Sequence, residues 1–274
     1  MKKVSIIGLG WIGLPLARYL KSKGIEVVGS TTSPDKLERI QSEGIAAVQF
    51  ELKPFPQGKK FQRLFQAEAM IVNIPPRSRT QVGDFYLEQL KFLRSMIDQS
   101  SVKKVIFVSS TGIYPEKPKQ EEYIENFPLS KENCGNPTLL KAEELMEKDR
   151  DFELTIVRFG GLMGGDRIPG KYFGGKENVE GHTRVNFIHR IDTVRLLSWI
   201  LEKELWNEVF NGVAPIHSIR KEIYERNHLD LGFPLPASYQ QANAGEDRLI
   251  SGKKFLKTGF QFEFPDPLDF KYDS

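Results

Sequence analysis

The stretch KVSIIGLGWIGLPLA, residues 3–17, decides the fold of this chain. Its first half is a short apolar run rich in Val and Ile, which is typical of a buried strand. A helical pattern follows the glycines and ends at Gly24, because glycine commonly terminates helices. The sequence therefore predicts a strand, a glycine-rich turn and a helix at its start.

The turn carries the spacing G-x-G-x-x-G at Gly8, Gly10 and Gly13. The first glycine permits a tight turn, the second lets the backbone approach a pyrophosphate, and the third lets helix and strand pack closely. The N–H groups of the helix N-terminus would then face the phosphates. We expect a dinucleotide site at these glycines and at Trp11 and Ile12. A glycine-rich turn without a ligand is the alternative.

Strand and helix patterns alternate through the first 160 residues, which predicts a parallel sheet covered on both faces. The expected fold is a doubly wound α/β Rossmann sheet with a small C-terminal substrate lobe. We assign residues 1–160 to the dinucleotide-binding core, with 184–213 returning to it, and 161–183 and 214–274 to the lobe. The further strands are expected at 25–31, 45–52, 69–76, 103–111 and 153–161, and the further helices at 33–44, 84–100 and 136–148.

Composition excludes several classes of protein. The 274 residues are 39% hydrophobic, which is enough for a sizeable core, and 39 basic and 36 acidic residues are mixed along the chain. That mixture favours a solvated surface over a nucleic-acid partner. Cys134 is the only cysteine, so the chain has no internal disulfide and suits a reducing cytoplasm. No run approaches the roughly 18 apolar residues of a membrane span, and the four histidines lack metal-ligand spacing.

The second strand ends without an acidic residue, which bears on the choice of cofactor. An acid at this tip would accept the ribose 2′-OH of NAD. Here Ser30, Thr31 and Thr32 carry hydroxyls, and Lys36 and Arg39 on the next helix could approach a 2′-phosphate. NADP is therefore preferred over NAD. A capping turn at Ser33 is the plainer interpretation, and both can hold.

Four motifs together resemble the extended short-chain dehydrogenase/reductase superfamily, the NAD-dependent epimerase/dehydratase group. They are the glycine turn, SSTGIYP at 109–115, RFGG at 158–161 and VNFIHRIDTV at 185–194. With NIPPR at 73–77, the set looks most like the atypical branch of that superfamily. The resemblance implies an NAD(P)-binding oxidoreductase or epimerase acting on a small polar, sugar-like substrate. The cofactor contacts that it implies further along the chain are Ile74, Pro75, Pro76, Ser109, Ser110, Lys141, Phe159 and Gly160.

The resemblance breaks at the main acid/base. The superfamily places a catalytic Ser or Thr after the fifth strand, where Thr111 or Ser110 is the match. It also carries a Tyr-x-x-x-Lys helix, and here Lys141 matches the lysine while Pro137 stands in place of the tyrosine. Thr138, one residue on, is a poor acid. Catalysis by the usual tyrosine is therefore not expected, and a non-catalytic dinucleotide sensor is the competing function.

Other residues near the expected site have two interpretations each. Lys141 is expected to bind the nicotinamide ribose, and the alternative is a surface lysine paired with Glu144. Tyr114 is expected at the pocket rim as a catalytic or substrate contact, or else in a packing role. Arg77 is placed to meet an acidic substrate group, or is a solvated loop arginine. Asp192 is expected to cap a helix. Superfamily members also pair the helices matching 84–99 and 137–149, so a homodimer is one expected state.

Overall fold

The computed structural model describes residues 1–76, 83–117, 122–241 and 247–273, so Arg77 lies outside the described residues. Contacts between Cα atoms divide the chain into two compact units. The core expected from the sequence differs from the first unit, since 114–135, 158–160, 184–193 and 210–213 belong to the second. Unit 1 comprises residues 1–113, 136–157 and 194–209, and unit 2 comprises 114–135, 158–193 and 210–274.

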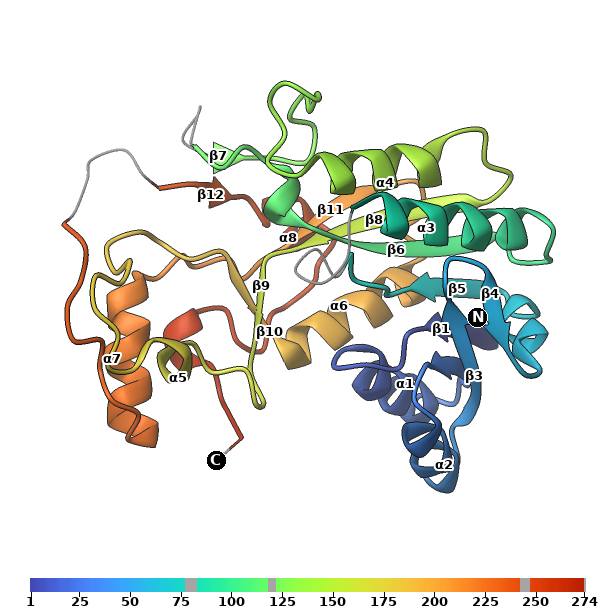
Figure 1. The fold of residues 1–274 in the computed structure, drawn as a ribbon, viewed down its shortest axis with the longest axis horizontal. Coiled ribbons are helices and arrows are strands. Elements are labelled where there is room, and N and C mark those ends of the chain that lie inside the picture. Colours follow the sequence, from blue (N-terminus) through green and yellow to red (C-terminus); the bar gives the residue numbers. More distant parts are fainter. Residues whose placement is uncertain (77–82, 118–121, 242–246, 274) are drawn as a thin grey trace. The chain divides into compact units, whose positions relative to one another are not determined.

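An eight-stranded sheet runs through the described part of the chain in the order β11-β8-β6-β5-β1-β2-β3-β4 (Figure 1). β1 pairs in parallel with both β2 and β5, so the chain winds outward on one side of β1 and then returns to its other side. This confirms the doubly wound Rossmann sheet, and the β1/β5 boundary is its switch point. The strands are β1 Lys3–Ile7, β2 Glu26–Thr31, β3 Ala46–Leu52, β4 Pro56–Gly58, β5 Ala69–Val72, β6 Lys104–Ser110, β8 Glu153–Phe159 and β11 Val209–Gly212.

Helices cover both faces of this sheet, with α3 and α4 on one face and α1, α2 and α6 on the other (Figure 1). The predicted cap at Ser33 is confirmed, and Asn136 caps the helix expected at 136–148 in the same way. The Ser33 side chain accepts the N–H of Lys36 at the start of α2, and the Asn136 side chain accepts two N–H groups at the start of α4. The helices are α1 Gly13–Ser22, α2 Pro34–Ser42, α3 Gly83–Asp98, α4 Pro137–Glu147 and α6 Arg190–Lys203.

The core of unit 1 forms where α3 and α4 meet the sheet. Tyr86, Leu90 and Leu93 lie on one stripe of α3 and are essentially inaccessible to solvent. They pack in one cluster with Val105 and Phe107 of β6. This spacing of three and four residues is the reason the segment is a helix with one buried face. The same cluster includes Ala142 of α4 and Val72 of β5, so it joins both helices to the sheet.

Unit 2 contains several short strands and helices. β9 pairs with β10 and β12 with β7, all in parallel. Two of these elements, β9 and α5, fall in the segment 161–183 that reads as loop from its glycines and charges. The elements are β7 Glu122–Tyr123, β9 Gly161–Met163, α5 Pro169–Phe173, β10 Phe187–His189, α7 Arg220–Leu231, β12 Leu249–Ile250, α8 Lys253–Leu256 and a 3-10 turn at Pro267–Asp269. Two further 3-10 turns, Phe61–Phe65 and Thr111–Ile113, belong to unit 1.

Asp192 does not cap its helix, because α6 begins two residues earlier at Arg190. Its buried carboxylate instead accepts the backbone N–H groups of Glu263 and Phe264, each at 2.8 Å. The expected cap is therefore wrong, and this residue anchors the C-terminal segment of unit 2.

Among the described residues, no helix has the length and apolar character that crossing a membrane requires.

Candidate functional site

The glycine turn joins β1 to α1, and two of its glycines are required by the chain itself. Gly8 has φ +106°, and a Cβ there would lie 2.6 Å from the carbonyl oxygen of Asn73. A Cβ on Gly13 would lie 2.1 Å from the carbonyl oxygen of Gly8. A Cβ on Gly10, in contrast, would meet nothing within 4 Å. The space at Gly10 is therefore open to a ligand rather than filled by the protein.

Hydrogen bonds from β2 and from the residue after β5 hold this turn in place. The N–H of Gly8 donates to the Ser30 hydroxyl oxygen at 3.0 Å. Asn73 approaches from the other side, and its amide nitrogen donates to the carbonyl oxygen of Gly8 at 3.3 Å. Ser30, expected to contact cofactor, thus also shapes the loop that would bind it.

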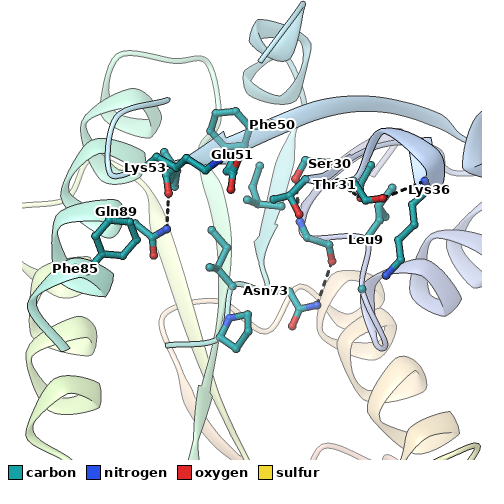
Figure 2. Close-up of a pocket in the computed structure, with 18 residues that line it drawn as sticks. Leu9, Ser30, Thr31, Lys36, Phe50, Glu51, Lys53, Asn73, Phe85 and Gln89 are labelled. Atoms are coloured by element: carbon teal, nitrogen blue, oxygen red, sulfur yellow. Dashed lines mark hydrogen bonds and ion pairs between the residues drawn. The ribbon is translucent and has the colours of Figure 1, made fainter. Parts of the chain in front are cut away.

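A cavity of about 300 Å³ opens beside the turn, at the carboxyl ends of β1, β2, β3 and β5. Figure 2 shows its lining side chains. The cofactor residues expected from the sequence that line it are Gly8, Gly10, Ser30, Thr31, Thr32, Lys36, Ile74 and Pro75. Those that do not line it are Trp11, Ile12, Gly13, Pro76, Ser109, Ser110, Lys141, Phe159 and Gly160.

The charges around the cavity favour an anion. Lys36 lines it from α2, and no carboxylate stands at the tip of β2. The carboxylate that lines the cavity, Glu51, forms an ion pair with Lys53 at 2.8 Å. Two ammonium groups therefore face one carboxylate, a balance that attracts phosphate.

The residues at the far end of the cavity were not predicted from the sequence. Phe50, Glu51 and Leu52 come from the end of β3, and Phe85 and Gln89 come from α3. A signal existed, because β3 runs parallel to β2 and β1, and the carboxyl ends of parallel strands lie at the ligand edge of a doubly wound sheet. The spacing of four between Phe85 and Gln89 also places both on one helix face.

The three hydroxyls after β6 have different environments. Ser109 donates to the carboxylate of Glu143 on α4 across 2.6 Å, and both side chains are buried. The Ser110 hydroxyl oxygen accepts the N–H of Gly112 at 3.1 Å and remains partly exposed. Thr111 is only 5% exposed. Ser110 is thus the hydroxyl with the best access to a ligand.

The inward face of α4 does not carry the residues expected there. Leu139 and Glu143, four apart, are among the buried positions, whereas Pro137 and Lys141 are exposed. Lys141 borders a surface groove between α3 and α4 that Asp84 also lines. Lys141 therefore faces away from β6, and its role as a cofactor ligand remains a prediction.

Tyr114 is fully buried in unit 2, so the expected rim position is wrong. The guanidinium of Arg158 donates to its phenol oxygen at 2.9 Å, and the phenol donates to the side-chain oxygen of Asn211 at 2.9 Å. Burial raises the pKa of Tyr114, although Arg158 acts in the opposite direction. This environment favours the packing role for Tyr114.

Close packing within unit 2 accounts for the presence of Phe159 and Gly160. The ring of Phe159 packs so closely on Gly212 that a Cβ on Gly212 would lie 2.3 Å from a ring carbon of Phe159. A Cβ on Gly160 would lie 2.1 Å from the carbonyl oxygen of Asn186. Close packing therefore explains the RFGG motif locally, and contact with a cofactor remains a prediction. Across the described ranges, His, Cys, Asp and Glu form no group of three or more that could bind a metal.

Comparison with known proteins gives one family. The model of the NAD(P)H-binding family matches residues 8–204. Protein YeeZ of Escherichia coli is 29% identical over 271 residues, 98% of each chain. The human epimerase family protein SDR39U1 is 27% identical over 94% of each chain. Its structure with NADPH has a TM-score of 0.70 at 17% identity, covering 97% of this chain and 96% of that one.

A structure with bound NAD extends this likeness of fold. It is a short-chain dehydrogenase/reductase superfamily protein from Agrobacterium tumefaciens, with a TM-score of 0.76 at 18% identity over 97% of this chain and 94% of that one.

Proposed function

Because this chain belongs to the NAD(P)H-binding family, as an atypical Rossmann protein like the short-chain dehydrogenases/reductases, we propose that it is an NAD(P)-dependent oxidoreductase or epimerase. Its substrate is a small polar, sugar-like molecule. The observation that supports this most directly is the open space at Gly10 beside a cavity that meets both the β2 tip and the β3 end.

The cavity residues fit a dinucleotide. The backbone at Gly8 and Gly10 would approach the pyrophosphate, the hydroxyls of Thr31 and Thr32 would meet the adenosine ribose, and Lys36 would bind its 2′-phosphate. The net positive charge of the cavity lining favours the additional 2′-phosphate of NADP, so NADP is the preferred cofactor. The bound cofactor would supply hydride transfer.

The protein would contribute a hydroxyl rather than a phenol to the reaction. The Ser109 proton is directed to Glu143, whereas the Ser110 oxygen accepts from Gly112 and keeps its own proton to donate. We assign to Ser110 the hydrogen bond to a substrate oxygen, ahead of the buried Thr111. The serine hydroxyl is a far weaker acid than the missing tyrosine, so carbonyl reduction with NADPH is expected to be slow.

The competing function is a dinucleotide sensor without turnover. The observation that favours it is that Leu139 is buried on the inward face of α4, because a leucine side chain has no proton to donate to a substrate. Consumption of NADPH with sugar-like carbonyl substrates separates the two functions, because a sensor binds the cofactor and leaves it unchanged.

The site itself is tested by Gly10→Val, measured by calorimetric titration with NADPH. Since a side chain at Gly10 meets nothing in the protein, the variant is expected to fold with unchanged unfolding free energy and to lose NADPH binding. Gly13→Val is the contrasting variant, because its side chain collides with Gly8 and is expected to lower stability as well. Equal NADPH binding by Gly10→Val and the wild type would place the site elsewhere.

Two further properties belong to this proposal. The outer surfaces of α3 and α4 would pair in a homodimer, although Phe92 is already partly buried and packs at a tilt against Phe55 with ring centres 4.8 Å apart. Light scattering at high concentration tests the dimer, and a monomer would end the idea. The single Cys134 suits a cytoplasmic location.

A further inference from the structure

Two side chains of α3 meet the end of the cavity that lies farthest along β3. Phe85 and Gln89 are one helical turn apart and both line the cavity, so an aromatic ring and an amide lie beside each other there (Figure 2). Leu52 and Ile74 complete an apolar surround. A flat heteroaromatic ring, which offers a face for stacking and an edge for hydrogen bonds, matches this combination.

The amide of Gln89 has a fixed orientation. Its nitrogen lies 2.5 Å from the carbonyl oxygen of Leu52. A carbonyl oxygen can only accept, so the NH₂ group of Gln89 must face Leu52. The amide oxygen is then the remaining group, and Figure 2 shows it on the opposite side from the Leu52 bond. Gln89 therefore presents an acceptor to whatever binds at this end.

We propose that Gln89 selects adenine at the base end of the dinucleotide site, with Phe85 stacking on the ring. The inference rests on the proposed function, because the ring must reach this end as part of an NAD(P) molecule. Adenine carries an exocyclic NH₂ donor on its edge, which the amide oxygen of Gln89 accepts. The nearby carboxylate of Glu51 is engaged by Lys53. Gln89 thus determines specificity for the base without touching the reacting end.

The consequence is discrimination against bases that carry an oxygen at the same position. Hypoxanthine replaces the NH₂ of adenine with a carbonyl, which would place an acceptor against the acceptor of Gln89. A site built to receive a donor rejects the analogue that lacks it, because a buried polar group is left unpaired. The discrimination therefore depends on the base alone and not on the phosphate or the nicotinamide.

The test compares NADPH with its deaminated analogue, nicotinamide hypoxanthine dinucleotide phosphate, by fluorescence titration. We expect the wild type to bind NADPH about tenfold more tightly, the scale of one hydrogen bond. Gln89→Leu should bring the two affinities within about twofold of each other. Gln99→Leu is the matched control, because this glutamine pairs with Ser95 and does not line the cavity, and it should keep the wild-type ratio.

A second variant separates stacking from edge recognition. Phe85→Leu should weaken both dinucleotides equally and leave their ratio unchanged. Equal affinity of the wild type for both dinucleotides would overturn the role of Gln89 and leave the proposed function standing. Loss of the ratio in Glu51→Ala but not in Gln89→Leu would assign the role to Glu51 and overturn the inference. Failure of the wild type to bind either dinucleotide would instead refute the proposed function.

Discussion

The hydroxyl of Ser109 and the carboxylate of Glu143 are joined by a hydrogen bond of 2.6 Å that links the end of β6 to the inner face of α4. The Glu143 side chain is only 5% exposed, and such deep burial is rare for a glutamate. Tyr86 on α3 lies close enough that the charge of Glu143 adds to the effect of burial in raising the Tyr86 pKa. The phenol of Tyr86 in turn binds the carbonyl oxygen of Ile74 at 3.1 Å, at the cavity wall.

From this hydrogen bond we predict that substitutions at Ser109 and Glu143 have non-additive effects on the free energy of unfolding. Glu143→Ala leaves the Ser109 hydroxyl without its acceptor, and Ser109→Ala removes a donor from a buried carboxylate. Each should lower the free energy of unfolding by about 1–3 kcal/mol, measured by urea denaturation. The double variant should lose less than the sum of the two, because both single changes break the same bond. Glu144→Ala, the exposed neighbour, should stay within about 0.5 kcal/mol of the wild type. Additive losses would mean that the bond contributes nothing.

Lys36 should set the preference between the two cofactors. Lys36→Met removes an ammonium group from the cavity lining, and we expect NADPH affinity to fall about tenfold, the scale of a charge-assisted hydrogen bond. NADH affinity should hardly change, because NAD has no 2′-phosphate. Arg39→Met on the same helix is the control, since Arg39 is exposed and does not line the cavity. Parallel titrations with both cofactors decide the matter, and an equal loss for NADH would remove Lys36 from the 2′-phosphate site.

Lys141 tests how far the superfamily motif can be transferred. The resemblance predicts that Lys141→Met weakens NADPH binding by about 1–2 kcal/mol, the loss of a charge-assisted hydrogen bond. The position of Lys141 on the surface groove predicts instead a change of less than about twofold, because an exposed charge outside the cavity interacts weakly. We expect the smaller effect. A loss of tenfold or more in calorimetry would restore the ligand role.

Much of the fold could be predicted from the sequence, because its signals are local. The glycine turn, the caps at Ser33 and Asn136 and the apolar stripe of α3 each depend on neighbours within one or two turns. The register of α4 against β6 could not be predicted. That register depends on which face of the helix packs on the sheet, and the buried face carries Leu139 and Glu143 two positions away from the motif match. A buried carboxylate stabilised by a serine 34 residues away has no signature in the sequence.

The candidate site shows the same division. The pyrophosphate end follows from spacing within the first 13 residues, whereas the base end brings β3 and α3 together across 37 residues between Leu52 and Gln89. Tyr114 illustrates the converse error. Its place after β6 suggests a pocket rim, but Arg158 and Asn211 approach from distant segments and enclose it.

His189 predicts a pH dependence of stability. Burial lowers the pKa of His189 below its ordinary value, and the ring accepts the N–H of Ile191 while its other nitrogen lies 2.8 Å from the carbonyl oxygen of Lys271. A neutral imidazole satisfies both contacts. The unfolded chain therefore binds a proton more readily, and the contribution of His189 to stability is present above about pH 6.5 and is lost as the pH falls.

Thermal unfolding between pH 8 and pH 5 checks this dependence. His189→Gln should lower the melting temperature at pH 8 and flatten its decline toward pH 5. His182→Gln, at an exposed position, should leave the curve unchanged. An equally steep decline in His189→Gln would assign the acid sensitivity to other groups.

The bond between Asp192 and the backbone of residues 263 and 264 has a consequence for how the chain is made. A ribosome releases α6 long before it releases the two N–H groups that this carboxylate accepts, which follow 71 and 72 residues later. At bacterial and eukaryotic synthesis rates of roughly 5–20 residues per second, that interval lasts about 4–14 seconds. The segments of unit 1 have all been synthesised by residue 209, so that unit can assemble first. Unit 2 must wait for its last stretch of chain, and a translation product stopped before residue 263 would lack both backbone donors that hold the Asp192 carboxylate.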